Sequence, residues 1–237
     1  MLDVAGLDKS FGGLHAVKNL SFSVGEGEIV GLIGPNGAGK TSVFGLLSGF
    51  LHPDGGRVTF RGRSIAGLPP HRINALGLAR TFQIVRPFPH LTVLRNVTVG
   101  ALSRHADPRE AARRALAVLG EVGLAAKRDQ LAASLTLAER KRLELARALA
   151  TEPVLLLLDE VMAGLNATET ERIVDLVGAI NRRGVAVLLI EHVMRAVMSL
   201  SQRIVVINYG ELIATGRPDT VAGDPRVIEA YLGAAPA

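Results

Sequence analysis

The chain has 237 residues, of which 48% are hydrophobic and 21% are charged, the balance of a globular protein with a sizeable core. It contains no cysteine, which excludes disulfide scaffolds and thiol catalysis, and its apolar runs are shorter than the ~20 residues of a membrane helix. A net charge of +5 favours anionic partners, such as nucleotides, nucleic acid or lipid headgroups, without choosing among them.

The first fifty residues predict strands that lead into a phosphate-binding loop. Residues 2–10 and 15–24 alternate apolar and polar side chains, as half-buried strands do, and residues 27–34 indicate a short buried strand. Next, GPNGAGKTS matches the P-loop pattern G-x-x-x-x-G-K-[ST] between that strand and a predicted helix. In such a loop the backbone N–H groups cradle phosphates, the lysine contacts the terminal phosphates and the following hydroxyl binds Mg²⁺.

The middle of the chain predicts a helical insertion. Residues 55–65 have strand composition between glycines, whereas the sequence becomes helical in character from about Pro69, and residues 84–150 form the insertion. Within it, Thr136 and Glu139 match a capping box at the start of a helix. Such a helix tip has unpaired N–H groups and a positive dipole end, so it is either an anion site or only a capped helix.

Two later apolar runs deliver polar residues at their carboxyl ends, where open α/β sheets bind ligands. LLLLDE ends in Asp159, which can hold Mg²⁺ through water, and Glu160, which can activate an attacking water. LLIEH ends at His192, which can donate to a γ-phosphate. The alternatives are a solvent-facing acidic pair and a histidine that caps a helix.

Gln83 and Phe11 are weaker candidates. Gln83 lies where the first lobe joins the insertion and could contact Mg²⁺ or water, although an exposed loop glutamine would serve no such role. Phe11 could stack on adenine, or it could be an ordinary core residue. No Asn-Lys-x-Asp motif for guanine occurs, so ATP is the expected nucleotide.

Strands that alternate with helices predict an α/β fold with a mainly parallel sheet. The P-loop makes this a P-loop NTPase with a mainly parallel core sheet, an N-terminal antiparallel β subdomain and an inserted α-helical subdomain. We expect one domain over 1–237, with its nucleotide-binding core in 1–83 and 151–237 and its helical subdomain in 84–150.

The order of these motifs resembles the nucleotide-binding subunit of ABC transporters over nearly the whole chain: Phe11, GPNGAGKTS, TFQ, LLLLDE, AGLN and EHV. The resemblance implies an ATP-hydrolysing, head-to-tail dimer in which each ATP lies between one copy's P-loop and the other copy's signature helix. It implies that Glu160 is the catalytic base, His192 the switch and Gln83 the coupling glutamine. The implied nucleotide-binding residues are Phe11, Gly34, Asn36, Gly37, Ala38, Gly39, Lys40, Thr41 and Ser42, and the implied Mg²⁺ residues are Thr41, Gln83 and Asp159.

The signature itself departs from the family pattern Leu-Ser-Gly-Gly-Gln. Here Thr136, Leu137, Ala138 and Glu139 follow Leu135, so one hydroxyl is kept, both glycines are lost and an acid replaces the glutamine. Backbone N–H groups survive these changes, and we expect these four residues to bind the other copy's ATP in trans. Glu139 adds negative charge near that anion unless its carboxylate turns back to the N–H of Thr136 in the capping box.

The finer sequence resembles the ATPases of branched-chain amino acid importers of bacteria and archaea, in which a second ABC ATPase subunit, alike or different, pairs with this one. That resemblance implies integral membrane permeases that dock on the segment after Gln83, about Ile84 to Val97, where Phe88, Pro89 and Leu91 offer an apolar contact. It also implies an extracytoplasmic substrate-binding protein as an indirect partner and a peripheral location on the cytoplasmic face of the membrane.

Related transporters of urea, amides or lipopolysaccharide, a soluble ABC ATPase that acts on nucleic acid, and a non-hydrolysing ATP-binding subunit remain alternatives. Nucleic acid is not an expected partner, because the basic residues of the signature helix are interleaved with acids and predict a solvated face. These basic residues are Arg140, Lys141, Arg142 and Arg147.

Overall fold

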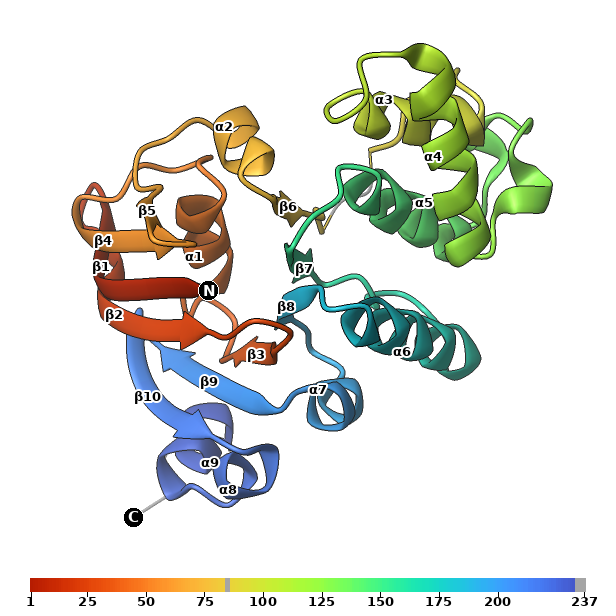
Figure 1. The fold of residues 1–237 in the computed structure, drawn as a ribbon. Coiled ribbons are helices and arrows are strands. Elements are labelled where there is room, and N and C mark those ends of the chain that lie inside the picture. The colour runs from red at the N-terminus through yellow and green to blue at the C-terminus, as the bar shows by residue number, and fades with distance from the viewer. Residues whose placement is uncertain (84–85, 233–237) are drawn as a thin grey trace.

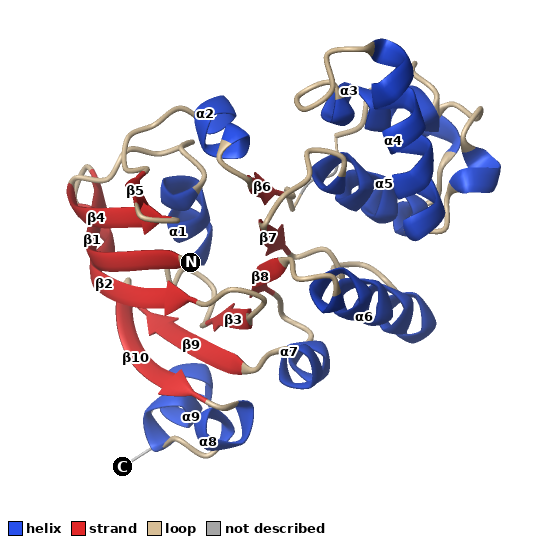
Figure 2. Cartoon of the chain, viewed as in Figure 1, coloured by secondary structure: helices blue, strands red, loops and turns tan. Residues whose placement is uncertain are grey.

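The computed structural model describes residues 1–83 and 86–232, and its strands form two sheets (Figures 1 and 2). The antiparallel sheet has the order β2-β1-β4-β5, and the larger, mainly parallel sheet has the order β10-β9-β3-β8-β7-β6. The strands are β1 (Leu2–Phe11), β2 (Leu14–Val24), β3 (Ile29–Ile33), β4 (Gly55–Phe60), β5 (Arg63–Ser64), β6 (Leu78–Arg80), β7 (Leu155–Asp159), β8 (Ala186–Ile190), β9 (Arg203–Asn208) and β10 (Glu211–Gly216).

The central strands β3, β7 and β8 are buried along their whole length because helices or the other sheet cover both faces. This explains why they read as unbroken apolar runs. Parallel registers such as Leu155↔Ala186 and Gly31↔Leu189 align their carboxyl ends at one edge of the sheet. The P-loop, Glu160 and His192 all follow these strands and therefore leave the sheet at the same edge.

The helices lie around the larger sheet and in a separate lobe, in which α3, α4 and α5 pack together (Figure 1). They are α1 (Lys40–Leu47), α2 (Pro70–Ala75), α3 (Val93–Ala101), α4 (Pro108–Glu121), α5 (Leu137–Leu149), α6 (Ala167–Arg182), α7 (Met194–Leu200), α8 (Pro218–Ala222) and α9 (Pro225–Leu232). Among the described residues, none of these helices has both the length and the hydropathy needed to cross a bilayer.

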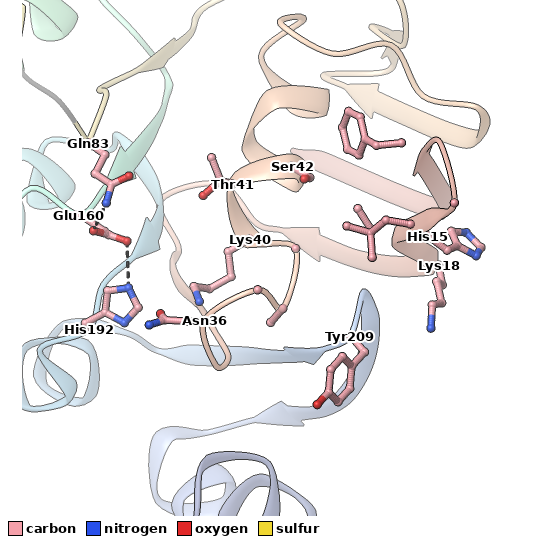
Figure 3. Close-up of a pocket in the computed structure, with 17 residues that line it drawn as sticks. His15, Lys18, Asn36, Lys40, Thr41, Ser42, Gln83, Glu160, His192 and Tyr209 are labelled. Carbon is pink, nitrogen blue, oxygen red and sulfur yellow. Dashed lines mark hydrogen bonds and ion pairs between the residues drawn. The ribbon is translucent and has the colours of Figure 1, made fainter. Parts of the chain in front are cut away.

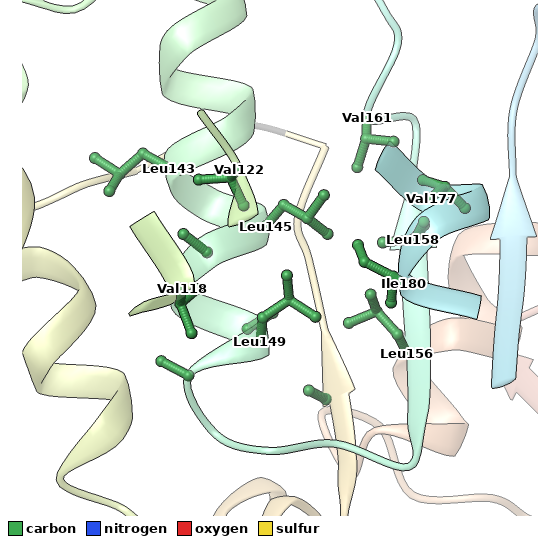
Figure 4. Close-up of a cluster of buried hydrophobic side chains, with 14 of the residues drawn as sticks. Val118, Val122, Leu143, Leu145, Leu149, Leu156, Leu158, Val161, Val177 and Ile180 are labelled. Atoms are coloured by element: carbon green, nitrogen blue, oxygen red, sulfur yellow. The ribbon is translucent and has the colours of Figure 1, made fainter. Parts of the chain in front are cut away.

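The helical lobe and the sheet share one hydrophobic cluster. Leu145 and Leu149 of α5 lie on the lobe side, and Leu156 and Leu158 of β7 lie on the sheet side (Figure 4). Burial of these side chains stabilises the contact between lobe and sheet, by ~25 cal/mol for each Å² of apolar surface removed from water. The helical insertion is therefore packed onto the core and is not a tethered appendage.

The expectation of helical structure from about Pro69 was wrong for residues 78–80. They form β6, which pairs in parallel with β7, for example Leu78 with Leu155. Gly77, at φ 104°, ends α2 and redirects the chain, and three residues are too few to show a strand periodicity. The fold class, by contrast, is confirmed.

Candidate active site

A cavity of about 660 Å³ lies at the carboxyl edge of the larger sheet and gathers most of the candidate residues (Figure 3). The candidates that line it are Phe11, Asn36, Gly37, Ala38, Gly39, Lys40, Thr41, Ser42, Gln83, Glu160 and His192. Segments from β1, the P-loop, β6, β7 and β8 therefore meet at one place although they are distant in sequence.

The P-loop turns sharply because two of its glycines allow close backbone approach. Gly39, at φ 101°, precedes α1, and a Cβ there would lie 2.4 Å from the Ala16 carbonyl oxygen. A Cβ on Gly34 would lie 2.1 Å from the Ile207 carbonyl oxygen. Neither position can therefore hold a side chain without moving the backbone, which leaves the loop N–H groups open to a ligand.

Lys40 is buried at the start of α1, and its Nζ donates to the carbonyl oxygens of Gly34 at 2.7 Å and Pro35 at 2.9 Å. Burial lowers the pKa of this amine, while the nearby carboxylates of Glu160 and Asp159 oppose that shift. The ammonium thus lies against the loop, on the side of the cavity that Glu160 lines (Figure 3). This is where phosphate oxygens would meet positive charge.

Glu160 is held on both carboxylate oxygens. Gln83 donates from Nε2 to Oε2 at 2.7 Å, and His192 Nε2 lies 2.9 Å from Oε1 and donates to it (dashed lines in Figure 3). The backbone of Glu160 has φ 49°, an unusual conformation for a residue with a Cβ. Its N–H donates to the carbonyl oxygen of Ile190. The carboxylate is therefore aimed into the cavity by groups from three different strand ends.

Asp159 ends β7 and does not line the cavity. Its side chain is 2% exposed and pairs with Arg80 at 2.8 Å. Burial raises the pKa of Asp159, and the hydrogen bond and charge of Arg80 counteract this rise. Sequence reasoning missed Arg80, because β6 was not recognised as the neighbour of β7.

The expected solvated face of α5 was wrong for Lys141, which is 4% exposed. Its Nζ donates to the carbonyl oxygens of Glu160 at 2.9 Å and Gln83 at 3.2 Å. A buried cation therefore connects α5 to the backbone of Glu160 and of Gln83. Glu144 of the same helix is also buried and accepts the N–H of Phe82.

Phe11 ends β1 and is 42% exposed, so it is a wall of the cavity and not a core residue. The β1–β2 hairpin also supplies His15 and Lys18, and the β9–β10 turn supplies Tyr209 (Figure 3). Sequence reasoning missed these three, since only the pairing of distant strands brings them to the P-loop. For His15 and Lys18 the one signal was proximity to Phe11 in the same hairpin, and Tyr209 gave no such signal.

The signature residues lie outside this cavity, at the tip of α5. The capping box is confirmed: Glu139 N–H donates to Thr136 Oγ1 at 3.3 Å, and Thr136 N–H donates to Glu139 Oε2 at 3.1 Å. Leu137 is exposed, and Thr136, Ala138 and Glu139 line a separate hollow of about 140 Å³ between α5 and α6. In one chain, then, the tip and the P-loop face different spaces.

Aromatic side chains gather on the surface between the helical lobe and the core. Phe82 and Phe50 are exposed and meet edge to face with their ring centroids 5.4 Å apart. Phe88 is also exposed, and Asn96 fixes its backbone by bonds to both its N–H and its carbonyl. Of the predicted docking segment, Ile84 and Val85 lie outside the described residues. Sequence reasoning missed Phe50 and Phe82.

Comparisons with known proteins agree with this geometry. Residues 17–163 match the family described as ABC transporter, and residues 211–237 match that described as branched-chain amino acid ATP-binding cassette transporter. The chain is 44% identical over 251 residues to the high-affinity branched-chain amino acid transport ATP-binding protein LivG of Salmonella typhimurium, a match that covers 99% of this chain and 98% of the relative.

A second relative and a solved structure give the same picture. The chain is 43% identical over 252 residues to the corresponding protein BraF of Pseudomonas aeruginosa, with 99% of this chain and 98% of the relative covered. A crystal structure of the ADP conformation of an ATP-binding cassette of an ABC transporter superposes with a TM-score of 0.90, at 30% identity over 99% of both chains. The similarity thus extends over both lobes.

Proposed function

The chain belongs to the branched-chain amino acid family of ABC transporter ATP-binding proteins, and we propose that it powers an importer of branched-chain amino acids by hydrolysing ATP. The observation that carries this proposal is the cavity in which the P-loop faces Glu160, itself held between Gln83 and His192. The family assignment supports the ATPase, and the relatives at 43–44% identity support the cargo.

The candidate residues named from the sequence have chemical roles in this proposal. Phe11 stacks on the adenine, residues 34–42 surround the phosphates and Lys40 transfers its hydrogen bonds from loop carbonyls to phosphate oxygens. Glu160 accepts a proton from the attacking water, because its carboxylate is the acceptor aimed into the cavity. His192 and Gln83 hold that carboxylate and are placed to respond when a γ-phosphate arrives.

Mg²⁺ fits the oxygen donors next to the P-loop. Thr41 and Gln83 line the cavity and offer a hydroxyl and an amide oxygen, the hard ligands that this ion prefers, supplemented by phosphates and water. The buried carboxylate of Asp159 would act on the ion through a water molecule. When bound, Mg²⁺ neutralises developing charge on the phosphates. Arg80 pairs with the buried Asp159 carboxylate at 2.8 Å and opposes the rise in its pKa that burial causes.

The working unit in this proposal is a dimer with a second ABC ATPase subunit. Thr136, Leu137, Ala138 and Glu139 lie away from the cavity of their own chain, as residues that act on the other subunit's ATP would. The tip of α5 offers backbone N–H groups and the positive end of a helix of 13 residues. Residues 84–150 form the helical subdomain that carries this tip.

The membrane partners dock on the groove between the two lobes. Phe50, Phe82 and Phe88 provide exposed aromatic contacts there, and Arg80 and Phe82 line the hollows on both sides of the junction. Integral membrane permeases that bind here would hold the subunit on the cytoplasmic face of the membrane. An extracytoplasmic substrate-binding protein would then contact the permeases and not this chain.

The ATPase is tested with Glu160→Gln. We expect the native protein to hydrolyse ATP steadily, and the variant to lose this activity and to dimerise with ATP and Mg²⁺, as measured by light scattering. Glu171→Gln, the same substitution at an exposed position of α6, should keep the native rate. A variant that keeps its ATPase activity, or stays monomeric at every ATP concentration, would refute the assigned roles.

The cargo is tested by purifying the complex from membranes through this subunit. The permeases that co-purify are reconstituted in liposomes with the binding protein encoded beside them, and ATP-dependent uptake of labelled leucine, isoleucine and valine is measured. Uptake of urea or short amides in place of these amino acids, or recovery of a lipopolysaccharide-extracting complex, would retain the ATPase and reject the proposed cargo.

A further inference from the structure

The substituted signature places a carboxylate at the end of the helix where an incoming triphosphate would bring its γ-phosphate. Glu139 is the third residue of α5, and its side chain is only 13% exposed. An unneutralised carboxylate at that position would repel a phosphate at short range, because like charges facing each other across an interface are costly. Either the tip does not bind phosphate, or something cancels the charge of Glu139.

Both carboxylate oxygens of Glu139 are in fact occupied. Oε2 accepts the backbone N–H of Thr136 in the capping box, and Oε1 pairs with Nζ of Lys127 at 2.5 Å. The hydrogen bond from Lys127 is the main reason that the pKa of Glu139 is lowered, ahead of the bond from Thr136. The acid is therefore ionised, turned back toward its own helix start and matched by a cation.

The backbone of Lys127 is held in place by neighbouring residues, and its side chain reaches Glu139 from there. It ends a 3-10 turn (Ala125–Lys127), its N–H donates to Leu124 and its carbonyl accepts from Gln130. The same segment is hydrogen-bonded to α3, where the Val93 N–H donates to the Gln130 carbonyl. The lysine therefore approaches the tip of α5 from a neighbouring element of the helical lobe.

Three other charged residues line this hollow, Arg142, Glu169 and Arg172, and the first two are engaged elsewhere. Arg142 donates to the carbonyls of Val122 and Gly123, and Glu169 closes the capping box of α6 with Asn166. Within residues 1–83 and 86–232, Lys127 is the basic residue that forms an ion pair with Glu139.

We propose that Lys127 is a positioning residue of the signature: it cancels the charge of Glu139 and holds that carboxylate in the capping box, so that N–H groups of the tip can donate to the other subunit's γ-phosphate. This inference rests on the proposed ATP-dependent dimer and explains how the family's glutamine can be replaced by an acid. It predicts that Lys127 matters only while residue 139 is negative.

The test is a double-mutant cycle in the Glu160→Gln background, with the ATP concentration for half-maximal dimerisation measured by light scattering. Lys127→Gln should raise this concentration about tenfold, because the uncancelled carboxylate of Glu139 would then face the γ-phosphate. Glu139→Gln should raise it less than Lys127→Gln does, because it removes the repelling charge and leaves an amide for the capping box. The double variant should lie within about twofold of Glu139→Gln, because Lys127 then has no charge to cancel.

Two controls separate electrostatics from loss of structure. Arg113→Gln removes a cation that pairs with Glu110 on α4, in the same lobe, and should leave dimerisation unchanged. Raising the salt concentration should reduce the deficit of Lys127→Gln, since screening weakens repulsion, whereas a damaged capping box would not recover. Urea unfolding of each variant reports separately on the stability of the fold.

The possible outcomes are distinct. A background protein that fails to dimerise with ATP would refute the proposed dimer, and this inference with it. A background that dimerises while Lys127→Gln matches it would refute the role of Lys127 alone. A double variant that needs at least as much ATP for dimerisation as Lys127→Gln would also refute it. Such a result would mean that the pair acts only by supporting the start of the helix.

Discussion

Replacing Glu191 by glutamine should remove most of the pH dependence of stability that this buried acid causes. Glu191 directly follows β8, is 2% exposed and accepts the N–H of Met162 at 2.8 Å. Burial raises its pKa from 4.5 to about 7, against the opposing effect of its backbone hydrogen bonds. Glutamine has nearly the same shape as the protonated acid and cannot ionise, so Glu191→Gln mimics the neutral form at every pH.

The magnitude follows from that pKa. Between about pH 4.5 and about 7 the native state keeps a proton that the unfolded chain releases, so the free energy of unfolding falls as pH rises through this window. A rise of about 2.5 pKa units, at 1.36 kcal/mol per unit, makes the full loss about 3 kcal/mol. The loss is complete above the native pKa and absent below the unfolded one.

The assay is urea unfolding of the native protein and of Glu191→Gln at several pH values from about 4.5 to about 8. We expect similar stability at the acid end and a variant more stable by about 3 kcal/mol at the alkaline end. Glu171→Gln, an exposed substitution of the same type, should follow the native protein throughout. Parallel curves for the native protein and Glu191→Gln would refute the reasoning, since the acid would then not be protonated by burial.

Three further substitutions test the site. Gly34→Ala should destabilise the fold by about 2 kcal/mol or more and weaken nucleotide binding in a fluorescence titration, because the added methyl would overlap the Ile207 carbonyl oxygen; native affinity would contradict this. Arg80→Met should cost about 3–5 kcal/mol in urea unfolding by leaving Asp159 buried without its partner, and a loss below about 1 kcal/mol would contradict it. Lys141→Met should lower the ATPase rate about tenfold and change ATP affinity by less than about twofold, because it removes charged hydrogen bonds to the backbone of Gln83 and Glu160. A loss of ATP affinity as large as the loss of rate would contradict this.

The arrangement of the cavity was largely predictable from the sequence. A P-loop between a strand and a helix has one known geometry, and parallel strands place their carboxyl ends at a common edge. These two rules are sufficient to predict that Lys40, Glu160 and His192 lie at one edge of the sheet. The capping box at Thr136 was equally readable, because it depends on residues only three positions apart.

What the sequence could not reveal depends on contacts between distant segments. β6 has three residues, which are too few to show the periodicity of a strand. This strand nevertheless brings Arg80 into contact with Asp159. Lys141 looks like part of a charged helix face until the chain folds and buries its ammonium against two backbone carbonyls. In both cases a basic side chain has a partner that only the tertiary structure supplies.

The P-loop is preorganised by its own lysine. Because the Lys40 ammonium already binds two carbonyls of the loop, the curved backbone is held in shape through internal hydrogen bonds. An arriving triphosphate therefore exchanges partners with a rigid receptor, and the conformational entropy of the loop has been lost at the folding step and not at the encounter. Such a receptor binds nucleotide more tightly than a loop that must first become ordered, because binding then costs less entropy.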